Sequence, residues 1–384
     1  MTSAWTAEHL AALDWGQTGI IPLIAGTPDR SALDPARVYW DMWPLQTPGG
    51  MIARPAGREL WMALSAPKRG DPALRHFEAK IHWLERCGAH WHDRGPVLPD
   101  DAVAGWVMPY EREWAGSALL DDGIITLFFT AAGTSQRSGG YQQSLWSARA
   151  PIGPDGWPGE WSRPAPLIAR PSPFYQLADA HEGAPGTIKA FRDPAYFRDP
   201  ADGKEYCAFT ASLAASHSAF NGAFGLAMKQ AGSWQLLPPL IAADGVNNEL
   251  ERAHLVHHQG RYYAFWSTQK HTFAPHLRHA PTGLYGMVAD HVLGDYRPLN
   301  GSGLVLANPP GEPHQTYSWL VDAELQVSSF VDFHGLGGAA IPITPEAQSA
   351  AFGGVPAPLL RLVISDDNCH LAMTQPRIAH ARCD

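Results

Sequence analysis

Residues 38–44 read Val38-Tyr39-Trp40-Asp41-Met42-Trp43-Pro44, which places one carboxylate between two indoles directly before a proline. The flat faces of indole rings bind the C–H faces of sugars, and an ionised aspartate beneath an anomeric carbon can attack that carbon or stabilise positive charge on it. An isolated Trp-Asp-x-Trp is more often a pair of core tryptophans with a turn-capping aspartate. Two more carboxylate motifs downstream favour a sugar pocket.

The first of these motifs is Phe191-Arg192-Asp193-Pro194. The proline restricts Asp193 to an extended conformation. Arg192 supplies a planar fork of donors that suits sugar hydroxyls or a neighbouring carboxylate. Alone, an Arg-Asp-Pro is more often a turn than a site.

The second motif is Asn247-Asn248-Glu249-Leu250-Glu251-Arg252, which leads into an apolar and aromatic strand pattern. If the motif is part of that strand, the period of two puts Glu249 and Glu251 on one face, where like-charge repulsion raises the proton affinity of one of them. A carboxyl group kept protonated in this way can serve as a general acid.

Short strands recur after turns that contain glycine. The segments Ile124–Thr130, Glu205–Thr210 and Tyr262–Ser267 each follow such a turn and end in an aromatic residue with Thr or Ser, the pattern of a β-hairpin. Because the three acid motifs fall on different repeats, we expect an all-β chain that folds as a β-propeller, with a central funnel-shaped active site where the acids converge.

Helices are expected to be few. They are predicted at Ala7–Leu13 and at Asp71–Cys87, where apolar residues recur every three to four positions. No boundary divides the chain, since Pro151–Pro173 is better explained as a long loop than as a linker. We therefore expect residues 1–384 to form a single catalytic domain.

Taken together, these motifs resemble glycoside hydrolase family 68, which includes levansucrases, inulosucrases and bacterial β-fructofuranosidases that act on sucrose. Arg112–Ser117 is similar to the family's E-W-[SA]-G-[ST] element in the alanine version of Gram-negative members, and Gly303–Pro310 and Gln315–Ser318 resemble its C-terminal signatures. The resemblance covers nearly the whole chain and implies a propeller of five blades.

The resemblance also implies roles for the three acids. Asp41 would be the nucleophile, Asp193 the transition-state stabiliser and Glu251 the general acid/base. Asp41 would attack C2 of the fructosyl unit of sucrose while Glu251 protonates the departing glucose oxygen. Water or a sugar hydroxyl would then open the covalent fructosyl-enzyme, with net retention of configuration.

Substrate binding is assigned by the same resemblance to residues around these acids. Two indoles would wall the fructosyl subsite, an arginine and a glutamate would hold glucosyl hydroxyls, and an arginine and a tyrosine would orient the acid/base. These residues are, in that order, Trp40 and Trp114, Arg192 and Glu249, and Arg252 and Tyr317.

Gln269 departs from the family pattern, because polymer-forming relatives carry arginine or histidine at the corresponding acceptor edge of the glucose subsite. A neutral amide holds a growing chain less tightly, so we expect hydrolysis and short fructo-oligosaccharides. Lys270 or His271 would compensate if the register slips by a residue, so long-chain levan formation stays an alternative.

Composition restricts the partners. The net charge is −9 without a basic patch, which argues against nucleic acid and anionic membrane surfaces, and no apolar run approaches the roughly 20 residues of a membrane span. The expected partners are sucrose and fructosyl acceptors, and the sequence indicates no oligomeric state. The four cysteines form no C-x-x-C motif, and a Cys369–Cys383 bridge is one open alternative.

No cofactor and no metal are expected, because carboxylates perform both the protonation and the nucleophilic attack. Some Gram-positive relatives bind calcium partly through an aspartate just ahead of the acid/base motif, where this chain has Asn248. Met1–Trp5 shows no signal peptide, so we expect a protein that stays in the cytoplasm or is secreted without a cleaved leader.

Three alternatives remain. The related five-bladed family 32 would show N-D-P-N-G near the N-terminus and an E-C pair at the acid/base, where this chain has Glu251-Arg252. An arabinan-cleaving propeller would lack the paired indoles. A non-catalytic sugar-binding propeller would be expected to have lost at least one of the three acids.

Overall fold

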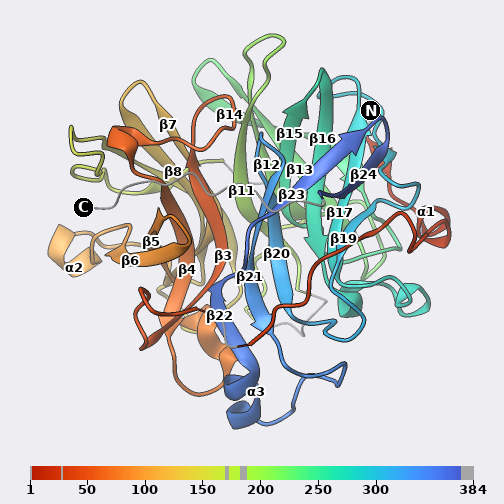
Figure 1. Ribbon diagram of the computed structural model, residues 1–384. Helices are drawn as coiled ribbons and strands as arrows, with labels where there is room; N and C mark the ends of the chain where they lie inside the picture. The colour runs from red at the N-terminus through yellow and green to blue at the C-terminus, as the bar shows by residue number, and fades with distance from the viewer. Residues whose placement is uncertain (1, 27–28, 169–172, 182–187, 373–384) are drawn as a thin grey trace.

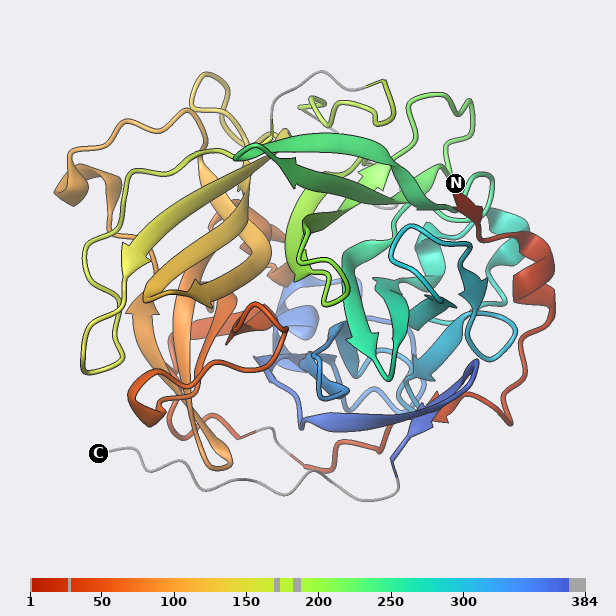
Figure 2. The same cartoon turned by 90° about the horizontal axis from the view of Figure 1, so that it is seen from above.

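The computed structural model describes residues 2–26, 29–168, 173–181 and 188–372. Strands dominate this part of the chain, and they form four hydrogen-bonded sheets that surround the centre of the molecule (Figures 1 and 2). The expectation of a mostly β protein is therefore confirmed.

The largest sheet joins two sets of antiparallel strands. The sets meet where β3 and β7 pair in parallel, with Leu45 opposite Ala118. In order, the sheet contains β10 (Ala165–Pro166), β9 (Gln143–Pro151), β8 (Ile124–Ala132), β7 (Arg112–Asp121), β3 (Arg37–Gln46), β4 (Leu60–Pro67), β5 (Lys80–Cys87) and β6 (His90–Pro96).

The remaining strands form three smaller sheets. The first contains β1 (Ser3–Ala4), β14 (Ser233–Ala242), β13 (Gly222–Gln230), β12 (Glu205–Ser212) and β11 (Phe191–Arg198). The second contains β15 (Glu251–His258), β16 (Arg261–Thr268), β17 (Gly283–Ala289), β19 (Leu304–Ala307) and β2 (Gly19–Ile20), with β18 (Arg297–Pro298) beside β17. The third contains β20 (Thr316–Val321), β21 (Gln326–Phe333), β23 (Leu360–Ser365) and β24 (Asn368–Leu371), with β22 (Phe352–Pro356) beside β21.

Five strands from these sheets contact one another in a closed order: β3 lies against β7, β7 against β11, β11 against β15, β15 against β20, and β20 against β3. We call these the inner strands. Each inner strand is the first member of an antiparallel series, and each pairs with the next strand along the chain.

Every inner strand contains a break in its pairing register. In β7 the break lies between Trp114 and Gly116, where a Cβ on the glycine would overlap the carbonyl of Phe128. In the other four, a residue at the break has a left-handed backbone, and these are Asp41 (φ 43°), Asp193 (φ 59°), Arg252 (φ 57°) and Ser318 (φ 58°). Bulges of this kind re-aim side chains, and a non-glycine residue in this region costs on the order of 1–3 kcal/mol.

Helices are few and short: α1 (Ala7–Ala11), α2 (Asp101–Ala104) and α3 (Pro345–Ala351), with 3-10 turns η1 (Pro55–Gly57), η2 (Pro72–Phe77), η3 (Lys270–Thr272) and η4 (Pro275–Leu277). The predicted N-terminal helix is confirmed. The helix predicted over Asp71–Cys87 is wrong, because only η2 forms and the chain then enters β5. Pairing of β5 with β4 buries Ile81 and Leu84 and outweighs the local helical spacing.

The core lies between the sheets and contains many of the tryptophans. Trp5, Trp61, Trp266 and Trp319 are fully buried there, so they are packing residues. Cys369 is a buried free thiol, which contradicts a Cys369–Cys383 bridge, and residue 383 lies outside the described residues. Within the described part of the chain, no helix is long and apolar enough to span a membrane.

Candidate active site

Asp41 lies at the bulge of β3, where its positive φ turns the side chain out of the regular pleat. Burial raises the pKa of Asp41 to about 6, with Arg252 opposing the shift and the charge of Glu251 adding to it. The carboxyl group is therefore ionised at neutral pH, yet it is poorly solvated. Such a carboxylate suits nucleophilic attack on an electrophilic carbon.

Asp193 occupies the corresponding bulge of β11 and is 5% exposed. Its Oδ2 accepts a hydrogen bond of 2.9 Å from the Thr210 hydroxyl, and its backbone N–H donates to the Thr130 hydroxyl at 2.8 Å. Burial raises the pKa of Asp193, while Arg192 opposes the shift. One bond fixes the carboxylate and the other fixes the backbone, and no hydrogen bond from the described residues reaches the second carboxylate oxygen, Oδ1.

Arg192 links the acids of two inner strands. Its guanidinium lies 3.5 Å from Asp193, 3.1 Å from Glu249 and 3.6 Å from Glu251. Burial acts to lower the pKa of Arg192, but these three carboxylates raise it above its usual value, so the group stays a cation. A planar cation shared among three carboxylates holds them close together despite their mutual repulsion.

Glu249 and Glu251 do converge, but not for the predicted reason. Glu249 lies before β15, which begins at Glu251, so a shared strand face does not bring them together. Arg192 does, by contacting both side chains. Burial raises the pKa of Glu249 to about 7, against the opposing charge of Arg192.

Tyr317 and Arg252 flank the acids on the other side. The Tyr317 hydroxyl donates a short hydrogen bond to Glu251 Oε2. The Arg252 side chain donates to the backbone carbonyls of Asp41 at 3.4 Å and Met42 at 3.1 Å, and its guanidinium lies 5.3 Å from the centre of the Trp43 ring. Arg252 therefore contacts the Asp41 bulge directly, and its expected role in orienting the acid/base stays a prediction.

Trp40 and Trp114 share an aromatic neighbour, His76, whose ring lies edge-on to both at centroid distances of 5.5 Å and 6.2 Å. The Trp114 indole donates to the His76 carbonyl at 2.9 Å, whereas the buried Trp40 N–H has no hydrogen-bond partner among the described residues. Burial keeps the pKa of His76 well below its usual value, so its ring is neutral.

Gln269 lines a cavity of about 360 Å³ together with Tyr317. Lys270, His271 and Asp332 line the same cavity, so both basic neighbours of Gln269 also reach it. Tyr317 connects this cavity to Glu251 through its hydroxyl. An acceptor sugar that enters here would meet the amide of Gln269 and the cations of Lys270 and Arg278, while burial lowers the pKa of His271.

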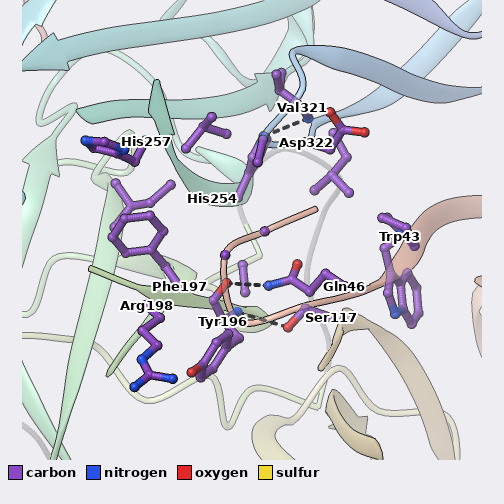
Figure 3. Close-up of a pocket in the computed structure, with 18 of the residues that line it drawn as sticks. Trp43, Gln46, Ser117, Tyr196, Phe197, Arg198, His254, His257, Val321 and Asp322 are labelled. Atoms are coloured by element: carbon purple, nitrogen blue, oxygen red, sulfur yellow. Dashed lines mark hydrogen bonds between the residues drawn. The ribbon is translucent and has the colours of Figure 1, made fainter. Parts of the chain in front are cut away.

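A second cavity, of about 120 Å³, is lined by Asp193 and Arg252 and by residues that follow the acids along the inner strands. Figure 3 shows Gln46 and Ser117 hydrogen-bonded to the backbone of Tyr196, and His254 accepting from the Val321 N–H at 2.9 Å.

The structure brings together nine of the ten predicted site residues through contacts around Arg192, Arg252, His76 and Glu251. The tenth, Gln269, lies on the adjoining cavity, which Tyr317 also lines. Sequence reasoning missed the hydroxyls of Thr130 and Thr210 that fix Asp193. The signal was present, because each ends one of the predicted hairpin strands.

Arg192 holds three carboxylates together, and paired carboxylates are typical of enzymes that act on glycosidic bonds. The family model for levansucrase and invertase matches residues 7–225 and 217–375. The chain therefore belongs to the levansucrase/invertase family, glycoside hydrolase family 68, and the resemblance read from its motifs is confirmed.

Individual relatives agree with this assignment. A levansucrase of Pseudomonas savastanoi pv. glycinea is 30% identical over 406 residues, covering 95% of this chain and 89% of the relative. The structure of an inulosucrase from Halalkalicoccus jeotgali bound to kestose has a TM-score of 0.86 at 34% identity and covers 100% of this chain and 97% of the relative. A levansucrase from Gluconacetobacter diazotrophicus shares the fold, with a TM-score of 0.80 at 22% identity over 99% of this chain and 92% of the relative.

Proposed function

We propose that this protein is a retaining fructosyltransferase, which cleaves sucrose and passes the fructosyl unit to water or to a sugar acceptor. As a member of its family, it is a sucrose-cleaving glycoside hydrolase. The observation that carries the residue assignments is the cluster in which Arg192 contacts Asp193, Glu249 and Glu251 while Asp41 lies within electrostatic reach of Glu251.

In the first step, a carboxylate oxygen of Asp41 attacks C2 of the fructosyl unit. The bond between C2 and the glucosyl oxygen breaks, its electron pair stays on that oxygen, and Glu251 donates a proton to it. Glucose leaves, and an ester joins Asp41 to C2. In the second step, Glu251 takes a proton from water or an acceptor hydroxyl, whose oxygen displaces Asp41, and the two inversions retain the configuration.

Asp193 stabilises the transition state between these species. Its free oxygen accepts hydrogen bonds from fructosyl hydroxyls, and these bonds strengthen as the ring gains oxocarbenium character. Trp40 and Trp114 form the wall of the fructosyl subsite, while Arg192 and Glu249 hold glucosyl hydroxyls. Tyr317 orients Glu251, and Arg252 supports Asp41 through the backbone.

The fold that supports this chemistry is proposed to be a five-bladed propeller formed by a single domain. The closed order of contacts among the five inner strands supports it, since each inner strand begins one antiparallel series. Blades arranged in this way bring Asp41, Asp193 and Glu251 from three different series into one funnel.

Hydrolysis and short transfer products are proposed to dominate over long levan. Gln269 supports this proposal, because a neutral amide lines the acceptor cavity beside Tyr317. The inulosucrase relative was solved with kestose bound, and we propose that this chain also accepts short fructo-oligosaccharides.

Incubation with sucrose, with free glucose and free fructose measured over time, tests the proposal. Equal release of the two sugars indicates hydrolysis, and an excess of glucose indicates transfer. Long polymer in the product would favour a levan-forming enzyme. Release of neither sugar would contradict the proposed function and favour a sugar-binding propeller.

A further inference from the structure

Arg75 and Asp332 are two half-buried, charged side chains that the proposed mechanism leaves without a role. Arg75 lies in η2, and Asp332 lies on β21, far away in the sequence. Arg75 Nε and Asp332 Oδ1 are both buried and have no hydrogen-bond partner among the described residues. Buried polar atoms without partners are rare in proteins and costly to the fold, so a pair of them beside a substrate pocket needs an explanation.

Arg75 is held rigidly in place. Its Nη1 donates a hydrogen bond of 2.7 Å to the Pro72 carbonyl, and its guanidinium lies 5.3 Å from the centre of the Trp40 ring and 4.6 Å from that of Phe352. Burial lowers the pKa of Arg75, while the carboxylates of Asp332, Asp41 and Glu251 oppose the shift. The guanidinium thus lies beside the indole proposed to wall the fructosyl subsite, within electrostatic reach of Asp41.

Asp332 lies close to Arg75, because Phe352, which the Arg75 guanidinium contacts, pairs across β22 and β21 with Phe333, the residue after Asp332. It lines the cavity that contains Tyr317 and Gln269, and its backbone N–H donates to the Gln315 carbonyl at 2.9 Å. Burial raises the pKa of Asp332 to about 7, with Arg75 opposing the shift and Asp41 adding to it. Arg75 and Asp332 influence each other electrostatically, yet no direct ion pair joins them within the described residues, so Arg75 Nε and Asp332 Oδ1 each stay without a partner there.

We infer that Arg75 and Asp332 are two further substrate-binding residues, which together hold the hydroxymethyl group on C1 of the fructosyl unit. A hydroxyl group both donates and accepts a hydrogen bond, so it can satisfy Arg75 Nε and Asp332 Oδ1 at once. This inference rests on the proposed function, because it takes Asp41 to be the residue that attacks C2.

The order of the inner strands selects C1 among the fructosyl hydroxymethyl groups. β3 carries Asp41. On one side of β3 lies β7 and, beyond it, β11, which carries Asp193. On the other side lie β20, β21 and β22. Asp332 therefore lies on the side of Asp41 away from Asp193, which binds ring hydroxyls. The exocyclic C1 is bonded directly to the C2 that Asp41 attacks, whereas C6 is attached to C5 on the far side of the ring oxygen, so of the two hydroxymethyl groups the one on C1 is nearer to a group beside Asp41.

The test measures kcat/KM for the wild type, Asp332→Asn and Arg75→Lys on three substrates. These are sucrose, sucrose lacking the fructosyl C1 hydroxyl, and sucrose lacking the fructosyl C6 hydroxyl. Asp322→Asn is the matched control, because Asp322 is another buried aspartate with an unpartnered oxygen, at the far end of β20, outside the Gln269 cavity. A melting curve for each variant checks that it folds.

On sucrose, we expect each of the two variants to lose about tenfold in kcat/KM, the effect of weakening one charge-assisted hydrogen bond, while Asp322→Asn changes it less than twofold. On the C1-deoxy substrate, the wild type should already be slow, and the variants should lose no more than about twofold relative to it. On the C6-deoxy substrate, the full tenfold difference should persist.

Equal losses for the variants on all three substrates would overturn the inference. If the variants' loss disappeared on the C6-deoxy substrate and persisted on the C1-deoxy substrate, the assignment to C1 would be overturned. Either result, with a wild type that cleaves sucrose, leaves the proposed function intact. A wild type that releases no glucose from sucrose would instead contradict the proposed function itself.

Discussion

The hydroxyl of Thr210 donates a 2.9 Å hydrogen bond to the carboxylate of Asp193. The oxygen of the Thr210 hydroxyl also accepts a hydrogen bond of 3.0 Å from the backbone N–H of Arg252, on the next inner strand. Thr130 repeats this arrangement between the Ala115 carbonyl and the Asp193 N–H. Hydroxyls on second strands therefore fasten neighbouring inner strands at the bulges that carry the proposed catalytic acids.

Replacement of this hydroxyl should affect both stability and rate. Thr210→Val keeps the shape but removes the bond to Asp193 and leaves the Arg252 N–H only its long bond of 3.4 Å to Asp193, which should cost about 1–3 kcal/mol of unfolding free energy. We expect kcat/KM to fall about tenfold as Asp193 loses its orientation. Urea unfolding and sucrose kinetics measure the two effects, and Thr126→Val, at a position of β8 away from the bulge, is the control. Unchanged kinetics would mean that Asp193 needs no fixing by Thr210.

Removal of the proposed nucleophile should separate activity from folding. Asp41→Ala should reduce glucose release from sucrose by at least about a thousandfold, because loss of a covalent nucleophile removes the low-barrier route. The melting temperature should stay the same or rise slightly, since a poorly solvated carboxyl group is lost. Asp202→Ala, at an exposed turn, should leave both quantities unchanged. Retention of more than a few per cent of wild-type turnover would exclude Asp41 as the nucleophile.

The acid limb of the pH profile should report Asp41. Its pKa is raised to about 6, and the group must be ionised to attack, so kcat/KM should fall below pH 6 and approach a tenfold loss per pH unit. Arg252 stabilises the ionised form, so Arg252→Gln should raise the pKa and move this limb to higher pH. A limb that does not move, or moves to lower pH, would show that another group controls it.

Asp322 should make the folded protein less stable at alkaline pH. Burial raises its pKa to about 7, above the value near 4 expected in the unfolded chain, so its contribution is fully present below pH 4 and is lost as the pH rises through 7. Asp322→Asn keeps the acceptor for the Glu324 and Gln326 N–H groups but cannot ionise. We expect the variant to melt higher than the wild type at pH 8 and no higher at pH 4. Parallel melting temperatures across this range would contradict the shift.

Gln269 should govern the partition between water and sugar acceptors. Gln269→Arg or Gln269→His adds a cation to the acceptor cavity, and one charge-assisted hydrogen bond is worth roughly 1.5–3 kcal/mol, so the excess of glucose over fructose should rise about tenfold or more. The wild type should give mainly fructose and short oligosaccharides. If it already builds long levan, His271→Gln and Lys270→Gln will show which neighbour supplies the missing charge.

Local sequence was enough to locate the acids, because each stands in a short motif with a proline, an indole or a second acid beside it. It was also enough for the hairpin strands β8, β12 and β16, which follow glycine turns. It failed at Asp71–Cys87, where pairing between β5 and β4 decides the conformation. The meeting of Arg75 with Asp332 depends on how η2 and β21 pack, which no local pattern contains.

The four residues with a left-handed backbone at the bulges lower the stability of the fold while they supply functional groups to the site. Glycine at positions 41, 193, 252 or 318 would relieve the backbone but would remove a carboxylate, a guanidinium or a hydroxyl from the candidate active site. In a mutant library screened only for thermal resistance, glycine should accumulate at these four positions. Growth on sucrose as the sole carbon source should eliminate the same clones, beginning with those changed at Asp41 and Asp193.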